Sequence, residues 1–144
     1  MKKFVLVAAM VGSLVSIEAI AACTSPRLNE VSLKNLLGGN TVCVPAVTIS
    51  TMTWQELHVG TSGGAIIDFK RGPLDTVDPS KPVGTWTVNA NPAGNNATVT
   101  HAYSGGGGTF IYTVHGTGAV GTNHSFCAGA TEIVGRVKSG GGAC

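Results

Sequence analysis

The stretch Val83-Gly84-Thr85-Trp86-Thr87-Val88-Asn89 places apolar residues or glycine alternately with polar residues from Gly84 onward. Residues 97–103 and 109–115 repeat this alternation, and the runs between the three segments consist mainly of Gly, Asn and Pro. A side-chain period of two between Gly- and Asn-containing turns predicts antiparallel β-hairpins. We therefore expect the centre of the chain to form three consecutive strands of one sheet.

Further short segments that predict strands precede and follow this centre. They lie at residues 41–44, with a continuation at 47–49 beyond Pro45, and at 53–59, 65–70, 124–127 and 132–138. Residues 71–82 contain three prolines and predict a loop. Seven or eight short strands in sequence are typical of an antiparallel meander, closed as a barrel or folded as a sandwich. We favour a single mainly β barrel, because a meander joins neighbours in order and closure removes exposed edges.

A short helix is predicted ahead of the first strand, over residues 27–37. Ser25 can cap it, and Pro26 suits the first helical position, where the missing N–H has no intrahelical partner. Gly38 and Gly39 provide its end. At about three turns such a helix is not stable in isolation, so we expect it to pack across one end of the barrel.

The side chains that share a face of each central strand form the expected core, because alternate residues of a strand point to the same side. These sets are Trp86 and Val88, then Ala97, Val99, His101 and Tyr103, then Phe110, Tyr112 and Val114. His101 is the one histidine in this set. It is interpreted either as a ligand-contacting group in a barrel cavity or as a hydrogen-bonded histidine of the core or the barrel mouth, and the second interpretation is favoured.

The first 22 residues have the pattern of a secretory signal peptide. Lys2 and Lys3 precede an apolar run at residues 4–17, and Ala19-Ile20-Ala21 forms a cleavage signal. The apolar run is too short for a helix to span a bilayer, which takes about 20 residues. We predict a signal peptide at 1–22, a single domain at 23–144, and export to the periplasm or the extracellular space.

The composition argues against several classes of function. The net charge is +2 and two of the nine basic residues lie in the signal peptide, so no basic surface for nucleic acid is expected. The histidines, cysteines and carboxylates show no metal-binding spacing, and no cofactor motif is present. No nucleophile–base pair or pair of acids can be placed together, so we expect no catalytic residues and a non-enzymatic protein.

The four cysteines predict two disulfides, since an even number in an exported chain is typical of disulfide pairing. Three pairings are possible. We favour Cys43 with Cys127 and Cys23 with Cys144, because chain termini are often close together. An alternative involves Ile20-Ala21-Ala22-Cys23, which resembles a bacterial lipobox; lipidation of Cys23 would anchor the protein to the envelope and would leave an odd thiol.

Two groups of charged residues are candidate surfaces. Trp54, Glu56 and His58 share a face of one predicted strand, and Asp68 shares a face of the next with Lys70. They form a site if that face lines a concavity, whereas the favoured alternative is a solvated face with weak cross-strand pairs.

The loop at 71–82 is the second candidate surface. Arg71, Asp75 and Asp78 give it charge, and long loops on rigid scaffolds often carry binding, so we predict a partner contact there.

A resemblance to a known architecture rests on three features: the helix end Leu36-Leu37-Gly38-Gly39-Asn40-Thr41, the G-x-W at residues 84–86, and the Gly-punctuated meander through Tyr103, Tyr112 and Phe126. This layout resembles small exported bacterial β-barrels of the lipocalin-like or calycin-like kind, and is similar to uncharacterised secreted proteobacterial proteins with a G-T-W strand. Lipocalins carry G-x-W on the first strand, whereas here it lies mid-chain.

The resemblance implies a binding barrel that holds a small apolar ligand or blocks a partner protein, as periplasmic protease and lysozyme inhibitors of similar architecture do. An open cavity lined by Trp86, Tyr103, Phe110 and Tyr112 would favour the ligand. A filled core with a protruding loop would favour a protein partner. The alternative is a structural or envelope-associated protein that acts through its surface, with or without a lipid anchor at Cys23.

Overall fold

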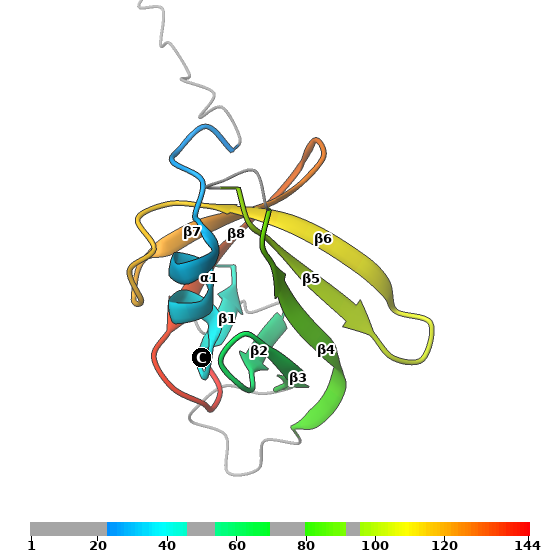
Figure 1. Ribbon diagram of the computed structural model, residues 1–144. Coiled ribbons are helices and arrows are strands. Elements are labelled where there is room, and N and C mark those ends of the chain that lie inside the picture. Colours follow the sequence, from blue (N-terminus) through cyan, green and yellow to red (C-terminus); the bar gives the residue numbers. More distant parts are fainter. Residues whose placement is uncertain (1–22, 46–53, 70–79, 92–95) are drawn as a thin grey trace, which may run out of the picture.

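The computed structural model describes residues 23–45, 54–69, 80–91 and 96–144. In these residues the strands form a closed antiparallel barrel in which each strand pairs with its neighbours in sequence, and β1 pairs with β8 (Figure 1). The elements are α1 (Glu30–Leu37), β1 (Thr41–Val44), β2 (Trp54–His58), β3 (Gly63–Asp68), β4 (Lys81–Asn89), β5 (Thr98–Tyr103), β6 (Gly108–His115), β7 (Asn123–Ala128) and β8 (Thr131–Lys138). The predicted meander barrel is confirmed.

β4 begins earlier than the sequence predicts. Lys81 and Pro82, assigned to the loop at 71–82, pair with Asp68 and Ile67 of β3. The register shifts between Ile66 and Ile67, so the pairing is irregular beside Pro82, and a proline is tolerated at such a position. The remaining predictions for 47–49, 53 and 70–79 lie outside the described residues.

The helix begins later than predicted, at Glu30, and its cap is Asn29 rather than Ser25. The Asn29 side chain accepts a hydrogen bond from the Ser32 backbone N–H at 2.8 Å. The preceding segment pairs with β6 instead, and the Leu28 backbone N–H donates to the Val114 carbonyl at 2.8 Å. That pairing holds the chain extended, which explains why Pro26 does not start the helix.

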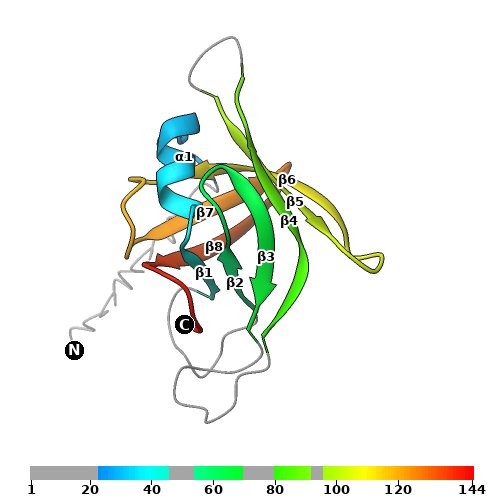
Figure 2. The ribbon, with the colours of Figure 1, turned by 60° about the horizontal axis from the view of Figure 1, so that its bottom comes forward.

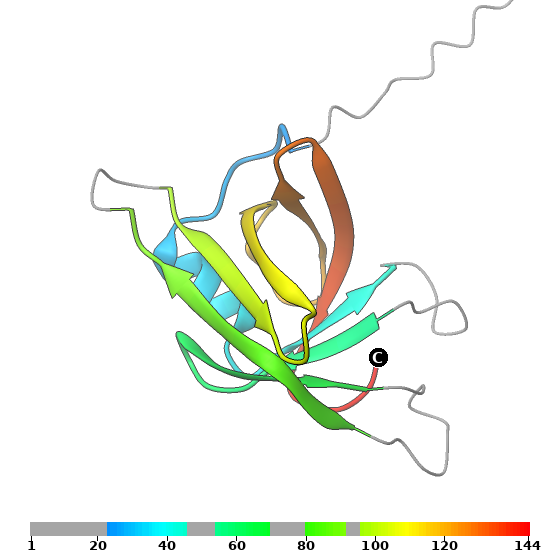
Figure 3. The same ribbon diagram turned by 90° about the vertical axis from the view of Figure 1, so that its right-hand side faces the viewer.

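α1 packs against β4 and β5 at the end of the barrel where β1 begins (Figure 3). Its side chains Leu33, Leu36 and Leu37 have no exposed surface and join the barrel core. Three leucines therefore close this end, as the sequence predicts for a short helix that needs tertiary packing. No helix among the described residues has the length and apolar character needed to cross a membrane.

The close approach of β5 explains why the G-x-W motif has a glycine at position 84. A Cβ atom at this position would lie 2.3 Å from the Ala102 carbonyl oxygen and 2.9 Å from the Tyr103 Cα on β5. We expect Gly84→Ala to lower the free energy of unfolding by about 2 kcal/mol, because the backbone must move to relieve the clash. Urea unfolding followed by circular dichroism measures this loss. Thr85→Ala on the exposed face of β4 is the control and should change stability by less than about 0.5 kcal/mol.

The disulfides pair Cys23 with Cys127 and Cys43 with Cys144, so the favoured sequence-based pairing is wrong. Each terminal segment lies on a different part of the barrel. The segment after Cys23 pairs with β6, whose neighbour β7 carries Cys127. The opposite terminal segment covers β1 and β2, and Cys43 lies on β1. The two termini are thus bonded to strands rather than to each other.

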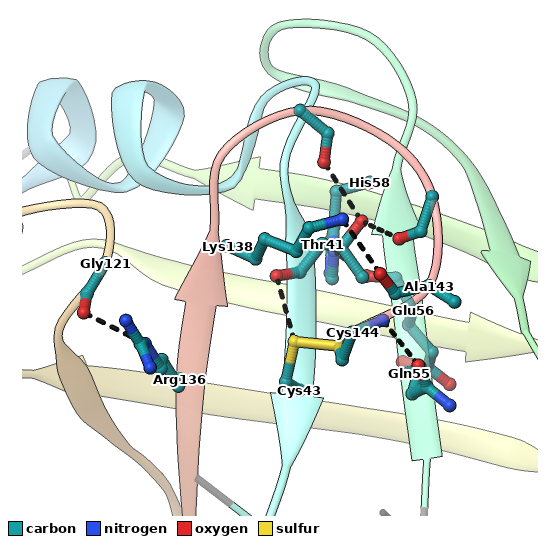
Figure 4. Close-up of a disulfide and its surroundings, with 12 residues drawn as sticks. Thr41, Cys43, Gln55, Glu56, His58, Gly121, Arg136, Lys138, Ala143 and Cys144 are labelled. Carbon is teal, nitrogen blue, oxygen red and sulfur yellow. Dashed lines mark hydrogen bonds between the residues drawn. A yellow bond between two sulfur atoms is a disulfide. The ribbon is translucent and has the colours of Figure 1, made fainter. Parts of the chain in front are cut away.

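The C-terminal strap, residues 139–144, lies over the outside of β1 and β2 (Figure 4). The Lys138 ammonium donates to the Ala143 carbonyl at 2.8 Å, and the Cys144 backbone N–H donates to the Gln55 side-chain oxygen. The Thr41 hydroxyl lies 3.0 Å from the Gly142 carbonyl. These contacts bury Thr41 and Gln55 although both point away from the barrel interior.

Candidate functional site

A cluster of polar side chains lies inside the barrel. The Nε2 atoms of His58 and His101 are 3.0 Å apart. The Tyr103 hydroxyl donates to the Glu56 carboxylate at 2.9 Å and lies 3.4 Å from His101 Nδ1. His58 and His101 have no exposed surface, and Glu56 is 5 % exposed. The structure thus brings together four residues from β2 and β5, strands that are not neighbours in the sheet.

Hydrogen bonding assigns the tautomers of the two histidines. His58 Nδ1 lies 3.2 Å from the Glu56 backbone carbonyl, which can only accept, so this nitrogen carries the proton and donates. His58 Nε2 is then an acceptor, and His101 Nε2–H donates to it. His101 Nδ1 is consequently unprotonated and lies 3.4 Å from the Tyr103 oxygen, whose single proton is donated to Glu56. The hydrogen bond between the two histidines therefore runs from His101 to His58, and it sets the orientation of both rings.

Burial determines the charge of this cluster. The pKa of His58 is lowered to about 3, mainly by desolvation and then by the nearby His101, while the hydrogen bond to the Glu56 carbonyl opposes the shift. Desolvation also lowers the pKa of His101 to about 4. Burial, followed by the Glu56 carboxylate, raises the pKa of Tyr103. At neutral pH both histidines and the tyrosine are therefore uncharged.

The polar face of β2 points into the barrel, so the favoured expectation of a solvated face is wrong. Glu56, His58 and Asp68 are all buried, and Trp54 is partly buried. Glu56 and Asp68 are direct partners in the β2–β3 register. Closure of the barrel places this face inside. Asp68 of β3 is thereby brought beside β2, as the sequence predicts for the right register, whereas Lys70 lies outside the described residues.

Aromatic rings fill the interior around the polar cluster. The His58 and Trp86 ring centroids are 5.2 Å apart, those of His101 and Tyr112 are 5.5 Å apart, and those of Tyr112 and Phe126 are 6.2 Å apart. Trp86 and Phe126 are each 1 % exposed. Because Trp86 and Phe126 have almost no exposed surface, no room for a ligand adjoins these two rings among the described residues.

The polar groups of this interior have protein partners. The Trp86 indole N–H donates to the Val59 carbonyl at 2.8 Å, in addition to the histidine and tyrosine bonds above. His124, a third buried histidine, accepts from the Gly118 backbone N–H at 3.1 Å and lies 3.1 Å from the Thr122 carbonyl. Burial lowers its pKa too. These bonds support the interpretation of His101 as a hydrogen-bonded core histidine.

The chemistry open to the cluster is limited. No group of three or more His, Cys, Asp or Glu residues among the described residues is arranged to hold a metal ion. The two histidines are closed off from solvent, so neither can exchange a proton with a bound molecule in this arrangement. Hydrogen bonds between buried polar side chains specify and rigidify a core. The cluster is accordingly assigned to the scaffold.

The hairpin of β5 and β6 extends beyond the rest of the barrel, away from α1 (Figures 1 and 2). Phe110 is 43 % exposed and Ile111 is 59 % exposed, so Phe110 is not the core residue that its parity predicts. The Phe110 ring contacts Tyr103 at 5.9 Å and stacks with Tyr112 at 6.3 Å between centroids. The aromatic interior thus continues out of the barrel to this hairpin.

Other exposed large apolar residues lie singly on different elements. They are Val31, Val59, Val120 and Val134. A shallow depression between α1 and the β2–β3 turn is lined mostly by polar or small residues, among them Lys34 and Ser62. Scattered exposed apolar residues are ordinary on protein surfaces, whereas Phe110 and Ile111 lie next to each other on β6 and expose apolar surface on both faces of one hairpin. The hairpin is therefore the distinctive apolar surface of the described residues.

The candidate loop residues Arg71, Asp75 and Asp78 lie outside the described residues. Ile111 was not singled out by sequence reasoning, because its face of β6 reads as the solvated one. The signal that points to it is the absence of charge and proline from residues 104–114. Comparisons of this chain with protein-family models, with curated protein sequences and with solved structures find no match.

Proposed function

We propose that this protein is an exported, non-enzymatic binding barrel that contacts a partner protein through the β5–β6 hairpin. The observation that carries the proposal is the pair Phe110 and Ile111, which is exposed at 43 % and 59 % on a projecting, uncharged hairpin. Exposed apolar residues gathered on a projecting element are typical of interaction sites. The signal-like segment at 1–22 and the two disulfides support export.

A protein partner is favoured over a small apolar ligand because the barrel interior is occupied. Of the four side chains expected around a ligand, Trp86 and Tyr112 are at most 7 % exposed inside the barrel, Tyr103 is partly buried, and Phe110 is 43 % exposed on the hairpin. Apolar ligand sites are concave and enclose most of the ligand surface, which needs space that these rings take up. The contact with a partner is consequently assigned to the outside of the barrel.

A protein partner is also favoured over a lipid-anchored envelope role. Lipidation at Cys23 requires a free thiol, and the Cys23 sulfur is bonded to Cys127. No free cysteine is present among the described residues.

A peptide selection tests the proposal. Random linear peptides displayed on phage are selected on the immobilised protein, and the dissociation constants of the enriched peptides are measured by calorimetry. We expect Phe110→Ser combined with Ile111→Thr to weaken binding at least about tenfold, because truncating a central apolar contact costs more than about 1.4 kcal/mol.

The matched control is Val134→Thr, which changes an apolar side chain of 43 % exposure on β8. It should leave the dissociation constants within about twofold. Enriched peptides that bind the hairpin variant as well as the wild type, or a selection that enriches none, would contradict the proposal.

A further inference from the structure

The two edges of β6 are not paired over the same length. On one side, β5 pairs with β6 as far as the Tyr103–Gly108 partners. On the other side, the pairing with β7 ends at Thr113 and Cys127, and β7 itself ends at Ala128. Residues 108–112 of β6 thus have a neighbouring strand on one edge, and β7 does not reach the other edge.

The hydrogen bonds between residues 26–28 and β6 show which way the backbone groups of β6 point. The Val114 carbonyl accepts from the Leu28 N–H on the β5 side of β6, where Arg27 also donates to the Ala97 carbonyl. Backbone groups of successive strand residues point to alternate edges. Those of Thr109 and Ile111 therefore point away from β5, toward the edge that β7 leaves.

The groups of Thr109 and Ile111 have no backbone partner in β7 or in the β7–β8 turn, among the described residues. Exposed sheet edges are ordinarily protected by charged residues, proline or bulges, because unpaired N–H and C=O groups invite another strand. Residues 108–112 contain neither a charged residue nor a proline. The open edge carries two donors and two acceptors with nothing in its sequence to repel a strand.

We propose that an extended segment of the partner polypeptide adds to this edge as an antiparallel strand beside Thr109, Phe110 and Ile111. This inference rests on the proposed function and specifies how the partner binds. Main-chain hydrogen bonds to Thr109 and Ile111 supply the common part of the affinity, as in other cases of strand addition. The added strand takes the position that β7 holds further along β6.

The side chains beside the edge define the chemistry of that segment. Its central residue lies opposite Phe110, next to the Phe110–Tyr112 stack, and favours an aromatic or large apolar side chain. Its two neighbours lie opposite Thr109 and Ile111 on the outer face, where β-branched residues pack best. The segment is uncharged, because no charge on residues 108–112 balances one.

A peptide segment fits this edge better than a second copy of the chain. Stable dimers bury about 1,200–2,000 Å² in total. Two copies joined by this edge would contribute mainly Phe110 and Ile111, each already 40 to 60 % covered within its own chain. A thin segment avoids this limit, because it can continue from the edge along Phe110 toward the half-buried Tyr103.

The test uses the full mature protein and a peptide from the selection described above, with single backbone N–H groups replaced by N-methyl. Methylation of a group that faces β6 should weaken binding at least about tenfold, since it removes a hydrogen bond and adds a clash. Methylation at the adjacent residue, whose N–H faces solvent, should leave binding within about twofold.

Amide hydrogen exchange gives an independent readout in the protein. We expect the bound peptide to slow exchange at Ile111 at least about tenfold, whereas the Phe110 amide faces β5 and should change little. Peptides that require Phe110 and Ile111 but show no such difference between methylated positions would overturn strand addition and leave the proposed function standing. Concentration-dependent protection of Ile111 without peptide, together with dimers in sedimentation, would assign the edge to a second copy and also overturn it.

Discussion

Lowering the pH from 7 to 5 is expected to reduce the free energy of unfolding by about 4 kcal/mol through His58 and His101, roughly 2 kcal/mol for each ring. Their pKa values in the folded protein are lowered to about 3 and about 4. In the unfolded chain both rings titrate near the ordinary value of 6.5. Between pH 6.5 and 4 the unfolded state binds protons that the folded state does not, so stability is full above this window and falls as the pH falls.

The paired variant His58→Leu, His101→Leu isolates this effect, because the carboxylates and His124 remain. Urea unfolding of the wild type and of this variant at pH 7 and pH 5 gives the difference in pH dependence. We expect the variant to lose about 4 kcal/mol less than the wild type on acidification. An identical pH dependence in both proteins would show that the two rings are not held neutral inside the barrel.

The single variant His101→Leu tests whether the two rings act as a unit. It leaves His58 Nε2 without the donor that now lies 3.0 Å away. A buried acceptor without a partner costs about 1–3 kcal/mol. At pH 7 the stability losses of the single variants His101→Leu and His58→Leu should therefore add up to more than the loss of the paired variant. Additive effects of the two substitutions would contradict the assigned hydrogen bond.

Replacing Cys43 and Cys144 by serine is expected to cost about 4–5 kcal/mol in free energy of unfolding. The bridge joins residues 101 positions apart. Closing a loop of that length lowers the entropy of the unfolded chain by an amount worth about 4.7 kcal/mol in the chain-entropy model. The same change also releases the C-terminal strap from Gln55.

The Cys23–Cys127 bridge provides the matched control, because its separation of 104 residues gives nearly the same entropic contribution. Urea unfolding of the two double-serine variants should show losses of similar size, and hydrogen exchange of the strap should rise only in the Cys43–Cys144 variant. A loss below about 1 kcal/mol for Cys43 and Cys144 would contradict this bridge as a major stabilising element.

The barrel was predictable because its signals are local. Alternation around Trp86, Gly-rich turns and a short amphipathic helix each depend on a few neighbouring residues, and the meander follows from their order. The inward position of His101 likewise follows from parity with Val99, which is fully buried. The predicted strand ends differ from the observed ones by a few residues. At Lys81 the difference arises because β3 and β4 continue to pair beyond a register shift.

The parts that failed depend on contacts between distant residues. β2 carries polar side chains at Gln55, Glu56 and His58, so its pattern does not tell which face is buried; the strap covers one face and barrel closure covers the other. The cysteine pairing depends on which strand each terminus crosses. The exposure of Phe110 depends on the length of β7 relative to β6, which no local pattern encodes.

The central claim is that the interior of this barrel is packed and that binding takes place on the outside, at the β5–β6 hairpin. Titration with the apolar fluorescent probe N-phenyl-1-naphthylamine tests this most directly, with Trp86 at the centre of the core as the internal reporter. The account predicts no saturable rise in probe fluorescence and no quenching of the tryptophan emission. Saturable binding of one probe per barrel, with quenching that is lost in Trp86→Phe, would contradict it.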